Sequence, residues 1–218
     1  MPAEGALRRG GPMDISLIET LRWEPDTGFV RLERHLARLA QSAEALGLPS
    51  AEKARNALFA APPPSALPLR IRLELFPDGR IDVQTAAFTP LAADTVWRVK
   101  LAATRLSSTD PLLRHKTSRR ALYAAARAEF PATEADEVIL LNERGELCEG
   151  TITSLFLDDG TDPLKTPPLG SGLLAGVLRE ELLETGGAIE AVLRPEDLAG
   201  GTILVGNSLR GLIRCVLA

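Results

Sequence analysis

Two β-hairpins, each with recognisable strands and a short turn, restrict the fold of this 218-residue chain more than any other feature. Their strands and turns are residues 69–76, Asp78-Gly79 and 81–86 in the first hairpin, and 138–141, 142–145 and 147–157 in the second. Hairpins pair neighbouring strands in antiparallel fashion, whereas a doubly wound sheet needs helices between its strands. Helices and strands alternate irregularly here, and no Gly-x-Gly-x-x-Gly follows a strand. The sequence therefore predicts an α+β fold rather than a Rossmann fold.

The remaining helix and strand patterns fall on either side of a linker. Apolar residues recur at helical spacing over residues 31–46, and Gly47 is placed to end that helix. The other expected elements are a strand at 15–23, a helix at 51–59, a strand at 96–102, a helix ending near 129, a helix at 177–184 and a strand at 203–205. Residues 89–94, TPLAAD, are the best linker candidate. We expect a smaller N-terminal α/β domain at 1–90 and a larger C-terminal domain at 91–218.

Composition argues against several classes of partner. The net charge is -4 and no basic stripe carries interleaved aromatic residues, so we expect no nucleic-acid partner. No apolar run approaches the length of a membrane span, and residues 1–11 resemble a tail or start-site extension rather than a secretory signal. Cys148 and Cys215 lie far apart, without a CxxC motif or a histidine cluster. We therefore expect no disulfide framework, no metal site and a reducing cytoplasmic location.

Lys116 and Glu149 are the leading candidates for chemistry. The chain is rich in arginine and has four lysines, of which Lys116 lies just before an expected helix. About thirty residues later, Glu149 ends the segment GELCE in the second hairpin. An amine that forms a Schiff base and a carboxylate that keeps a pyridine nitrogen protonated are what a pyridoxal-phosphate enzyme needs. Taken singly, either residue is more simply a solvated surface charge.

Anion-binding groups form a second set of candidates. Glycines at 170–176 precede the helix that begins at Val177, and the N–H groups of Val177 and Leu178 could hold a phosphate at its positive end. Arg38, on the first helix one turn after His35, could bind a phosphate in bidentate fashion. Loop glycines before a helix are common, however, and helix arginines are usually solvated.

Five segments, in the same order along the chain, resemble the class IV aminotransferases, the fold-type IV pyridoxal-phosphate enzymes. They are RHLARL at 34–39, LRHKT at 113–117, DEVILLNERGELCEGTITSLF at 136–156, GLLAGVLR at 172–179 and VGNS at 205–208. The family includes branched-chain aminotransferases, D-amino-acid transaminases and 4-amino-4-deoxychorismate lyases. The resemblance extends from about residue 15 to the C-terminus.

The resemblance implies a role for each matching residue. Lys116 would be the Schiff-base lysine and Glu149 the partner of the ring nitrogen. Arg38 and the backbone of Val177 and Leu178 would hold the phosphate, with Asn207 or Ser208 adding a contact. The implied fold is the two-domain architecture of D-amino-acid aminotransferase, with the cofactor between the domains of each subunit of a homodimer. Two positions depart from the pattern, since many members have Asn in place of Ser154 and Thr in place of Leu178.

Within the family, the resemblance favours a 4-amino-4-deoxychorismate lyase, which eliminates pyruvate to give 4-aminobenzoate for folate biosynthesis. The reasons are the compact N-terminus and Arg120, four residues after the lysine. The alternatives are an aminotransferase of branched-chain or D-amino acids and, from another class, a non-catalytic ligand-binding homologue. Arg105 is a candidate for binding a substrate carboxylate, whereas Arg114 and Arg120 are more simply surface charges.

Overall fold

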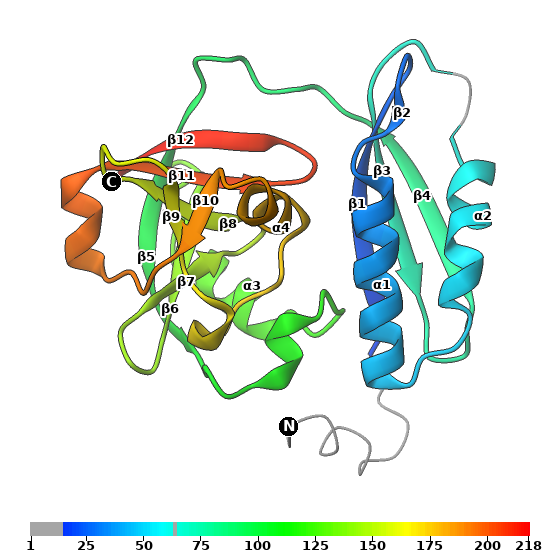
Figure 1. The fold of residues 1–218 in the computed structure, drawn as a ribbon, viewed down its shortest axis with the longest axis horizontal. Coiled ribbons are helices and arrows are strands. Elements are labelled where there is room, and N and C mark those ends of the chain that lie inside the picture. The colour runs from blue at the N-terminus through cyan, green and yellow to red at the C-terminus, as the bar shows by residue number, and fades with distance from the viewer. Residues whose placement is uncertain (1–14, 63–64) are drawn as a thin grey trace. The chain divides into compact units, whose positions relative to one another are not determined.

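A computed structural model describes residues 15–62 and 65–218, so the expected tail at 1–11 lies outside the described residues. The chain separates into two compact units (Figure 1). Unit 1 contains the chain up to Pro90 and also His115–Arg119, and unit 2 contains Leu91–Arg114 and Arg120–Ala218. The division into functional domains at 1–90 and 91–218 stays a prediction.

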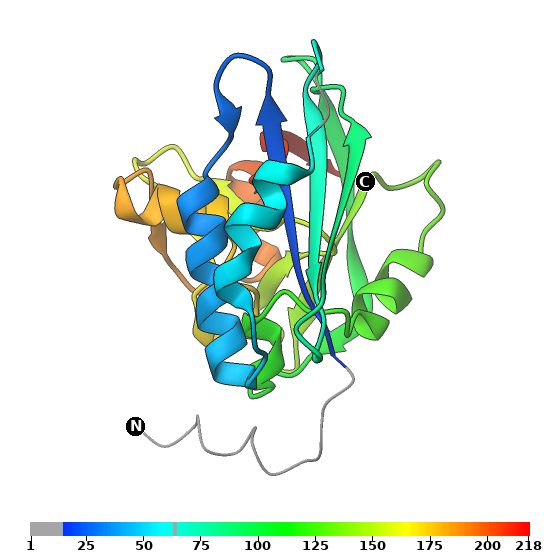
Figure 2. The same ribbon diagram turned by 90° about the vertical axis from the view of Figure 1, so that its right-hand side faces the viewer.

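Unit 1 is an antiparallel sheet with helices on one face (Figures 1 and 2). The strand order is β2-β1-β3-β4. Its elements are β1 (Leu17–Glu24), β2 (Gly28–Phe29), α1 (Leu32–Leu46), the 3-10 turn η2 (Ala51–Lys53), α2 (Ala54–Ala60), β3 (Leu69–Leu75) and β4 (Ile81–Ala87). Alternate residues of β1 and β3, such as Leu21 and Ile71, meet Leu39 of α1 and Leu58 of α2 in the core.

The segment around Lys116 is attached to the start of β1. Thr117 forms an antiparallel bridge with Leu17. On either side of it, the Ile18 N–H donates to the Lys116 carbonyl at 2.8 Å and the Ser118 N–H donates to the Ser16 carbonyl at 2.9 Å. The backbone on both sides of Lys116 is therefore held as a short strand of unit 1.

Unit 2 is built on an eight-stranded sheet of order β10-β9-β8-β11-β12-β5-β6-β7. Because β7 also pairs with β8, six of these strands form a closed ring, and the closing pair is Glu149 with Ser154. Its strands are β5 (Val96–Leu106), β6 (Glu137–Asn142), β7 (Leu147–Gly150), β8 (Ser154–Asp158), β9 (Leu164–Thr166), β10 (Ala188–Glu190), β11 (Thr202–Asn207) and β12 (Gly211–Leu217). Its helices and 3-10 turns are η3 (Pro111–Arg114), α3 (Ala121–Ala128), η4 (Leu169–Ser171), α4 (Val177–Glu184) and η5 (Pro195–Gly200).

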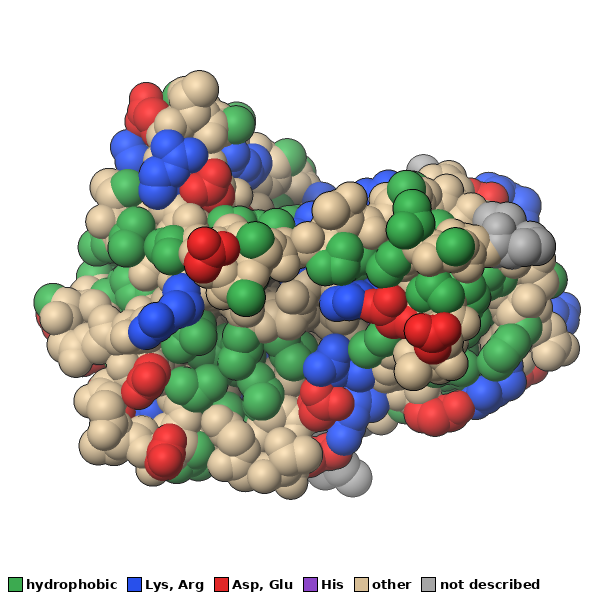
Figure 3. Space-filling view, turned by 90° about the horizontal axis from the view of Figure 1, so that it is seen from above, with side chains coloured by type: hydrophobic (Ala, Val, Ile, Leu, Met, Phe, Trp, Pro, Cys, Tyr) green, Lys and Arg blue, Asp and Glu red, His purple; other side chains and the backbone are tan. Residues whose placement is uncertain are grey.

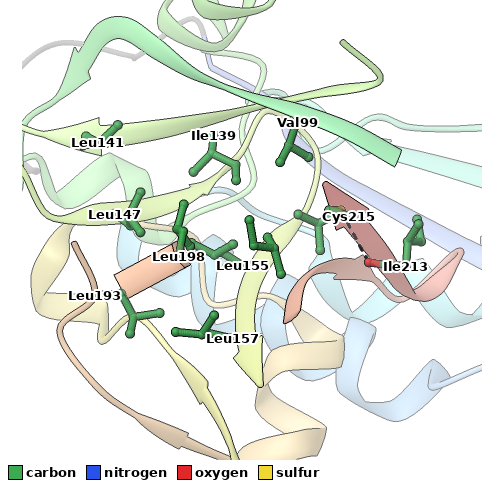
Figure 4. Close-up of a cluster of buried hydrophobic side chains, with 12 residues drawn as sticks. Val99, Ile139, Leu141, Leu147, Leu155, Leu157, Leu193, Leu198, Ile213 and Cys215 are labelled. Carbon is green, nitrogen blue, oxygen red and sulfur yellow. Dashed lines mark hydrogen bonds between the residues drawn. The ribbon is translucent and has the colours of Figure 1, made fainter. Parts of the chain in front are cut away.

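Aliphatic side chains from many of these strands fill the main core of unit 2 (Figure 4). Val99, Ile139, Leu155 and Ile213 meet there, each at most 4% exposed. A second cluster lies under α3, where Tyr123 and Ala126 pack with Val138 and Cys148. The strands are thus apolar on the ring interior and fix the positions of the residues at their ends.

The expected hairpin at 69–86 and the helices at 31–46 and 177–184 are confirmed to within a residue or two. The single strand expected at 147–157 is wrong, since it divides into β7 and β8. The chain turns back on itself there, since the Gly150 N–H donates to the Thr153 carbonyl at 2.8 Å, and the Glu137 carboxylate holds this turn by accepting the N–H groups of Thr151 and Ile152 at 3.0 and 3.1 Å. Strand β12 had not been expected, and β5 runs past residue 102 through a bulge to Leu106.

Charged residues of both signs lie among apolar ones on the face shown in Figure 3. Within the described residues, no helix combines the length and the apolar content that crossing a bilayer requires.

Candidate functional site

Lys116 differs from the other three lysines in its setting. Lys100 pairs with Glu134 at 2.8 Å, Lys165 pairs with Asp159, and Lys53 is exposed on η2. Lys116 is partly buried, and its backbone is fixed by the bridge to β1. Its positive charge is close enough to lower the pKa of His35 in the same unit. Of the four lysines, only Lys116 lies within a segment that matches the family pattern.

Arg38 lies on α1 and forms an ion pair with a buried carboxylate, Glu19, that was not predicted from the sequence. Glu19 of β1 accepts Arg38 Nε at 2.9 Å and Arg38 Nη2 at 2.6 Å, and its Oε2 also lies 2.6 Å from His35 Nδ1. Burial raises the pKa of Glu19, but the charge of Arg38 and the hydrogen bond with His35 outweigh burial and set it at about 2. Burial lowers the pKa of His35 below its usual range, so the ring is neutral and donates Nδ1–H to Glu19. Glu19 therefore fixes the rotamer of Arg38.

Glu149 is 4% exposed and sits at the pair that closes the strand ring. Its Oε1 accepts the Tyr123 hydroxyl at 2.6 Å and the Leu174 N–H at 3.2 Å. Burial, followed by the charge of Glu149, raises the pKa of Tyr123 far above its usual range, so the phenol remains a donor. A carboxylate in this position is placed by three elements: β7, α3 and the loop before α4.

The turn after Glu149 is organised by Glu137, which is 1% exposed. Besides the Thr151 and Ile152 N–H groups, its carboxylate accepts the hydroxyls of Thr151 at 2.5 Å and Thr153 at 2.9 Å. A side chain at Gly150 would collide with Thr153 and Glu137, so only glycine fits there. Together these contacts hold the backbone that follows Glu149 in one conformation.

The N-terminus of α4 is an anion-binding candidate within unit 2. Val177 and Leu178 are 2% and 4% exposed, and their N–H groups have no acceptor within the described part of unit 2. Buried backbone donors rarely lack a partner, and these two lie at the positive end of the helix dipole. Gly176, just before them, approaches so closely that an added Cβ would lie 2.5 Å from Ser154 Oγ.

The two departures from the family pattern are explained by packing in unit 2. Ser154 is small enough to let Gly176 approach, since only its hydroxyl lies near the position of the missing Cβ. The side chain of Leu178 packs against β11 at Gly206, where an added Cβ would lie 2.9 Å from Leu178 Cδ2. Any anion at Leu178 would thus meet the backbone N–H alone.

Asn207 is the last residue of β11, and Ser208 lies in the turn that leads to β12. The side-chain Oδ1 of Asn207 accepts the N–H groups of Leu209 and Arg210 at 3.1 and 2.9 Å, and its Nδ2 donates to the Ile152 carbonyl at 3.1 Å. The side chain of Asn207 therefore shapes the turn, and a ligand contact by Asn207 or by Ser208, which is 7% exposed, stays a prediction.

The candidate arginines have different settings. Arg105 is exposed and folds back on its own strand, donating to the carbonyls of Ala102 and Ala103 at the bulge of β5. Substrate binding by Arg105 stays a prediction. Arg114 is exposed, as expected for a surface charge. The prediction that Arg120 is a surface charge is wrong, because Arg120 donates to the Thr151 carbonyl and its Cζ lies 4.2 Å from the centroid of the Tyr123 ring.

The sequence does indicate one of the residues that were not predicted, namely Glu19. Glu19 alternates with Leu17 and Leu21, so strand periodicity places it on the buried face, where a carboxylate needs partners. Nothing local marks Tyr123 or Glu137, whose partners lie 26 and 14 to 16 residues away in the chain.

Each unit, taken by itself, carries groups whose chemistry suits pyridoxal phosphate. Unit 1 supplies an amine at Lys116 and a guanidinium at Arg38, and unit 2 supplies a buried carboxylate at Glu149 and the two N–H donors of α4. The donors of α4 suit a phosphate, since they are backbone groups at a helix start with no acceptor in unit 2. The described residues contain no group of three or more His, Cys, Asp or Glu arranged to hold a metal ion.

Comparison with known proteins identifies the family. The model of "Amino-transferase class IV" matches residues 16–217. A "Putative aminodeoxychorismate lyase" of Schizosaccharomyces pombe is 29% identical over 94% of this chain and 90% of that protein. A "Probable branched-chain-amino-acid aminotransferase" of Thermotoga maritima is 32% identical over 80% of this chain but only 64% of that protein.

Solved structures agree with this assignment. The crystal structure of a "Putative amino-acid aminotransferase" from Mesorhizobium loti has a TM-score of 0.87 and 51% identity, covering 94% of this chain and 100% of that one. A "hypothetical aminotransferase" from Mycobacterium tuberculosis, in its α-ketoglutarate and PMP bound form, shares the fold at a TM-score of 0.77 and 22% identity, over 93% and 80% of the two chains. This chain therefore belongs to the class IV aminotransferases, and it is an α+β, pyridoxal-phosphate-dependent enzyme with the fold of fold-type IV.

Proposed function

We propose that this enzyme is a 4-amino-4-deoxychorismate lyase, which releases pyruvate and forms 4-aminobenzoate for folate biosynthesis. The observation that carries the choice is the likeness, over most of both chains, to relatives named as such lyases. The chain spans 90% of the Schizosaccharomyces pombe relative named as a lyase, but 64% of the Thermotoga maritima relative named as a branched-chain aminotransferase. A structure titled as such a lyase, 30% identical with a TM-score of 0.80, is covered to 86% of its length.

The proposed roles follow the chemistry of each group. Bound pyridoxal phosphate supplies an electron sink for a bond broken at the substrate Cα. Lys116 would hold the cofactor covalently, and once the substrate amine has replaced it there, the freed amine of Lys116 would accept the Cα proton. Glu149 keeps the ring nitrogen protonated, and its two donors on Oε1 favour the ionised carboxylate that this role needs.

Phosphate binding is proposed for Arg38 and for the N–H groups of Val177 and Leu178, with Asn207 or Ser208 adding a contact. The bidentate bond to Glu19 holds the guanidinium of Arg38 rigidly, which reduces the entropy lost when it binds an anion. The helix start at Val177 offers donors that need no rearrangement. Arg105 is proposed to bind a carboxylate group of the substrate.

An aminotransferase of amino acids is the second candidate. It is favoured by the 51% identity to the Mesorhizobium loti protein, over the full length of that chain. Both reactions begin with removal of the Cα proton by the same lysine. They would differ in what the substrate then loses: its amino group in the aminotransferase, and pyruvate in the lyase.

Product analysis separates the two reactions. A lyase releases equal amounts of pyruvate and 4-aminobenzoate from aminodeoxychorismate, continuously and with no keto acid present. An aminotransferase mixed with leucine or D-alanine stops after one half-reaction, in the pyridoxamine form, until a keto acid is added. Such a stop, together with no pyruvate from aminodeoxychorismate, would replace the lyase by the aminotransferase. Inactivity in both assays would favour the third candidate, a non-catalytic homologue that binds a ligand.

The assembly is proposed to be a homodimer acting in the cytoplasm. Apolar side chains of unit 2 that remain exposed, including Val96, Leu212 and Val216 at 50%, 39% and 50%, suit burial against a second subunit. The two cysteines are free and buried, which suits a reducing compartment.

A further inference from the structure

We infer that Tyr123 is a positioning residue that holds the Glu149 carboxyl group in place and in its ionised form. The inference rests on the proposed role of Glu149 as the partner of the cofactor ring nitrogen. The effect of Tyr123 would be transmitted through Glu149, to which the Tyr123 hydroxyl donates a hydrogen bond.

The contact has the geometry of a charge-assisted hydrogen bond. The Tyr123 hydroxyl oxygen lies 2.6 Å from Glu149 Oε1. Hydrogen bonds from a hydroxyl group to a carboxylate typically have an oxygen–oxygen distance of about 2.5–2.7 Å. Tyr123 and Glu149 are 9% and 4% exposed, so little water competes for the bond. The Leu174 N–H donates to the same oxygen at 3.2 Å, and two donors on one oxygen restrict rotation of the carboxyl group.

Both the phenol and its helix are fixed. The Tyr123 ring packs in the cluster of Leu113, Ala126 and Val138, and the Arg120 guanidinium lies 4.2 Å from the ring centroid. Arg120 also donates to the Thr151 carbonyl. The first turn of α3 therefore contacts the chain at Glu149 and again two residues later. A phenol held in this way donates to the carboxylate throughout the working pH range.

A buried tyrosine hydroxyl needs some partner, so the bond alone is compatible with a purely structural role. The charge of Glu149 distinguishes a positioning role of Tyr123 from a purely structural one. Donation to an ionised carboxylate lowers its demand for a proton, so that the proton of the cofactor–Glu149 pair remains on the ring nitrogen. Without the hydroxyl, Glu149 would compete for that proton and the ring would be a weaker electron sink.

The test is a double-mutant cycle on the holoenzyme with Tyr123→Phe and Glu149→Gln. Two quantities are measured: kcat/KM, and the ¹⁵N chemical shift of pyridoxal phosphate labelled at the ring nitrogen. We expect Tyr123→Phe to lower kcat/KM about tenfold, the scale of one hydrogen bond to a charged group, and to move the ¹⁵N resonance toward that of a neutral pyridine. In the Glu149→Gln background, removal of the hydroxyl should change neither quantity further.

A matched control separates this effect from loss of any buried hydroxyl. Thr166 is fully buried in β9 of the same unit and donates its hydroxyl to the Leu155 carbonyl at 2.8 Å. Thr166→Val should lower the melting temperature by an amount comparable to Tyr123→Phe and leave the ¹⁵N resonance in place. Because Tyr123→Phe keeps the ring, it should fold like the wild type.

Tyr123 is the chain's only tyrosine, so ¹³Cζ-tyrosine labelling gives one resonance that reports on the hydroxyl directly. Glu149→Gln should shift this resonance. An unchanged ¹³C resonance, an unchanged ¹⁵N resonance in Tyr123→Phe, or an equal loss of kcat/KM in both backgrounds would each overturn the inference. The proposed role of Glu149 fails separately, and takes the inference with it, if Glu149→Gln alone leaves the ring ¹⁵N resonance at its wild-type position.

Discussion

Glu19 is a buried carboxylate whose charge depends on Arg38 and His35. Its pKa of about 2 in the folded protein lies below the ordinary value of 4.5. Ionised Glu19 therefore stabilises the fold above about pH 4.5, and this contribution is lost as the pH falls toward 2. The difference corresponds to about 3 kcal/mol of the free energy of unfolding.

Glu19→Gln should therefore flatten the dependence of stability on pH. Urea unfolding between pH 4.5 and 2.5 should show a much shallower loss of stability in the variant than in the wild type. Glu33→Gln is the matched control: the hydrogen bond from Arg55 lowers the pKa of Glu33 as well, but this ion pair is exposed, so the slope should change little. A wild-type slope in Glu19→Gln would mean that other groups control acid unfolding.

The second prediction at the residue scale concerns Lys116. Borohydride reduction of the holoenzyme, followed by peptide mapping, should place the pyridoxyl label on the peptide that contains Lys116. The three other lysines are controls within the same chain, since two form ion pairs and Lys53 is exposed. Label on Lys100 or Lys53 would reject the assignment of Lys116.

The role of a single residue could be predicted from the sequence when the segment around it matched the family pattern. Lys116, Glu149 and Arg38 each lie in a segment whose pattern resembles the family, so they could be named in advance. Tyr123 and Glu137 could not be named, because each gains its importance from a partner that only the folded chain brings near. Arg120 was judged a surface charge for the same reason, since its acceptor is the carbonyl of Thr151, 31 residues away.

At the scale of elements, the start of α4 depends on a glycine. Gly176→Ala would place a Cβ 2.5 Å from Ser154 Oγ and should displace the first turn of the helix. We expect the affinity for pyridoxal phosphate to fall about tenfold, which equilibrium dialysis with the apoenzyme would measure. Gly170→Ala is the control, because nothing lies within 4 Å of a Cβ at that position.

A second substitution tests the mechanism of that loss. Ser154→Ala removes the oxygen that the new Cβ would meet, and the Ser154 Cβ itself lies 3.8 Å away, an ordinary contact. The double variant Gly176→Ala/Ser154→Ala should therefore recover most of the affinity. Failure to recover would mean that the glycine is needed for another reason.

Elements were predicted well where hydrophobic spacing was regular, as in α1 and the β3–β4 hairpin. The break between β7 and β8 could not be predicted, because the turn between them is held by Glu137, a carboxylate from another strand that accepts the N–H groups of Thr151 and Ile152. Strand β12 was missed because its alternating residues follow a turn whose shape is set by Asn207.

At the scale of the whole molecule, the proposed homodimer is directly measurable. The chain has a mass of 23.4 kDa, and sedimentation equilibrium of the holoenzyme should give about twice that value. Leu212→Glu/Val216→Glu would place charges among the exposed apolar side chains of β12 and should shift the enzyme toward the monomer. A monomeric wild type over the micromolar range would reject the dimer.

The path of the chain between its units limits how this enzyme can be recombined. The polypeptide passes from unit 1 to unit 2, returns for residues His115–Arg119, and leaves again. A gene fragment beginning at residue 91 would encode that returning segment without the strand of Leu17 to which it is bridged. Chimeras that exchange the first ninety residues between relatives should therefore fold best when residues 115–119 are taken from the same parent as β1.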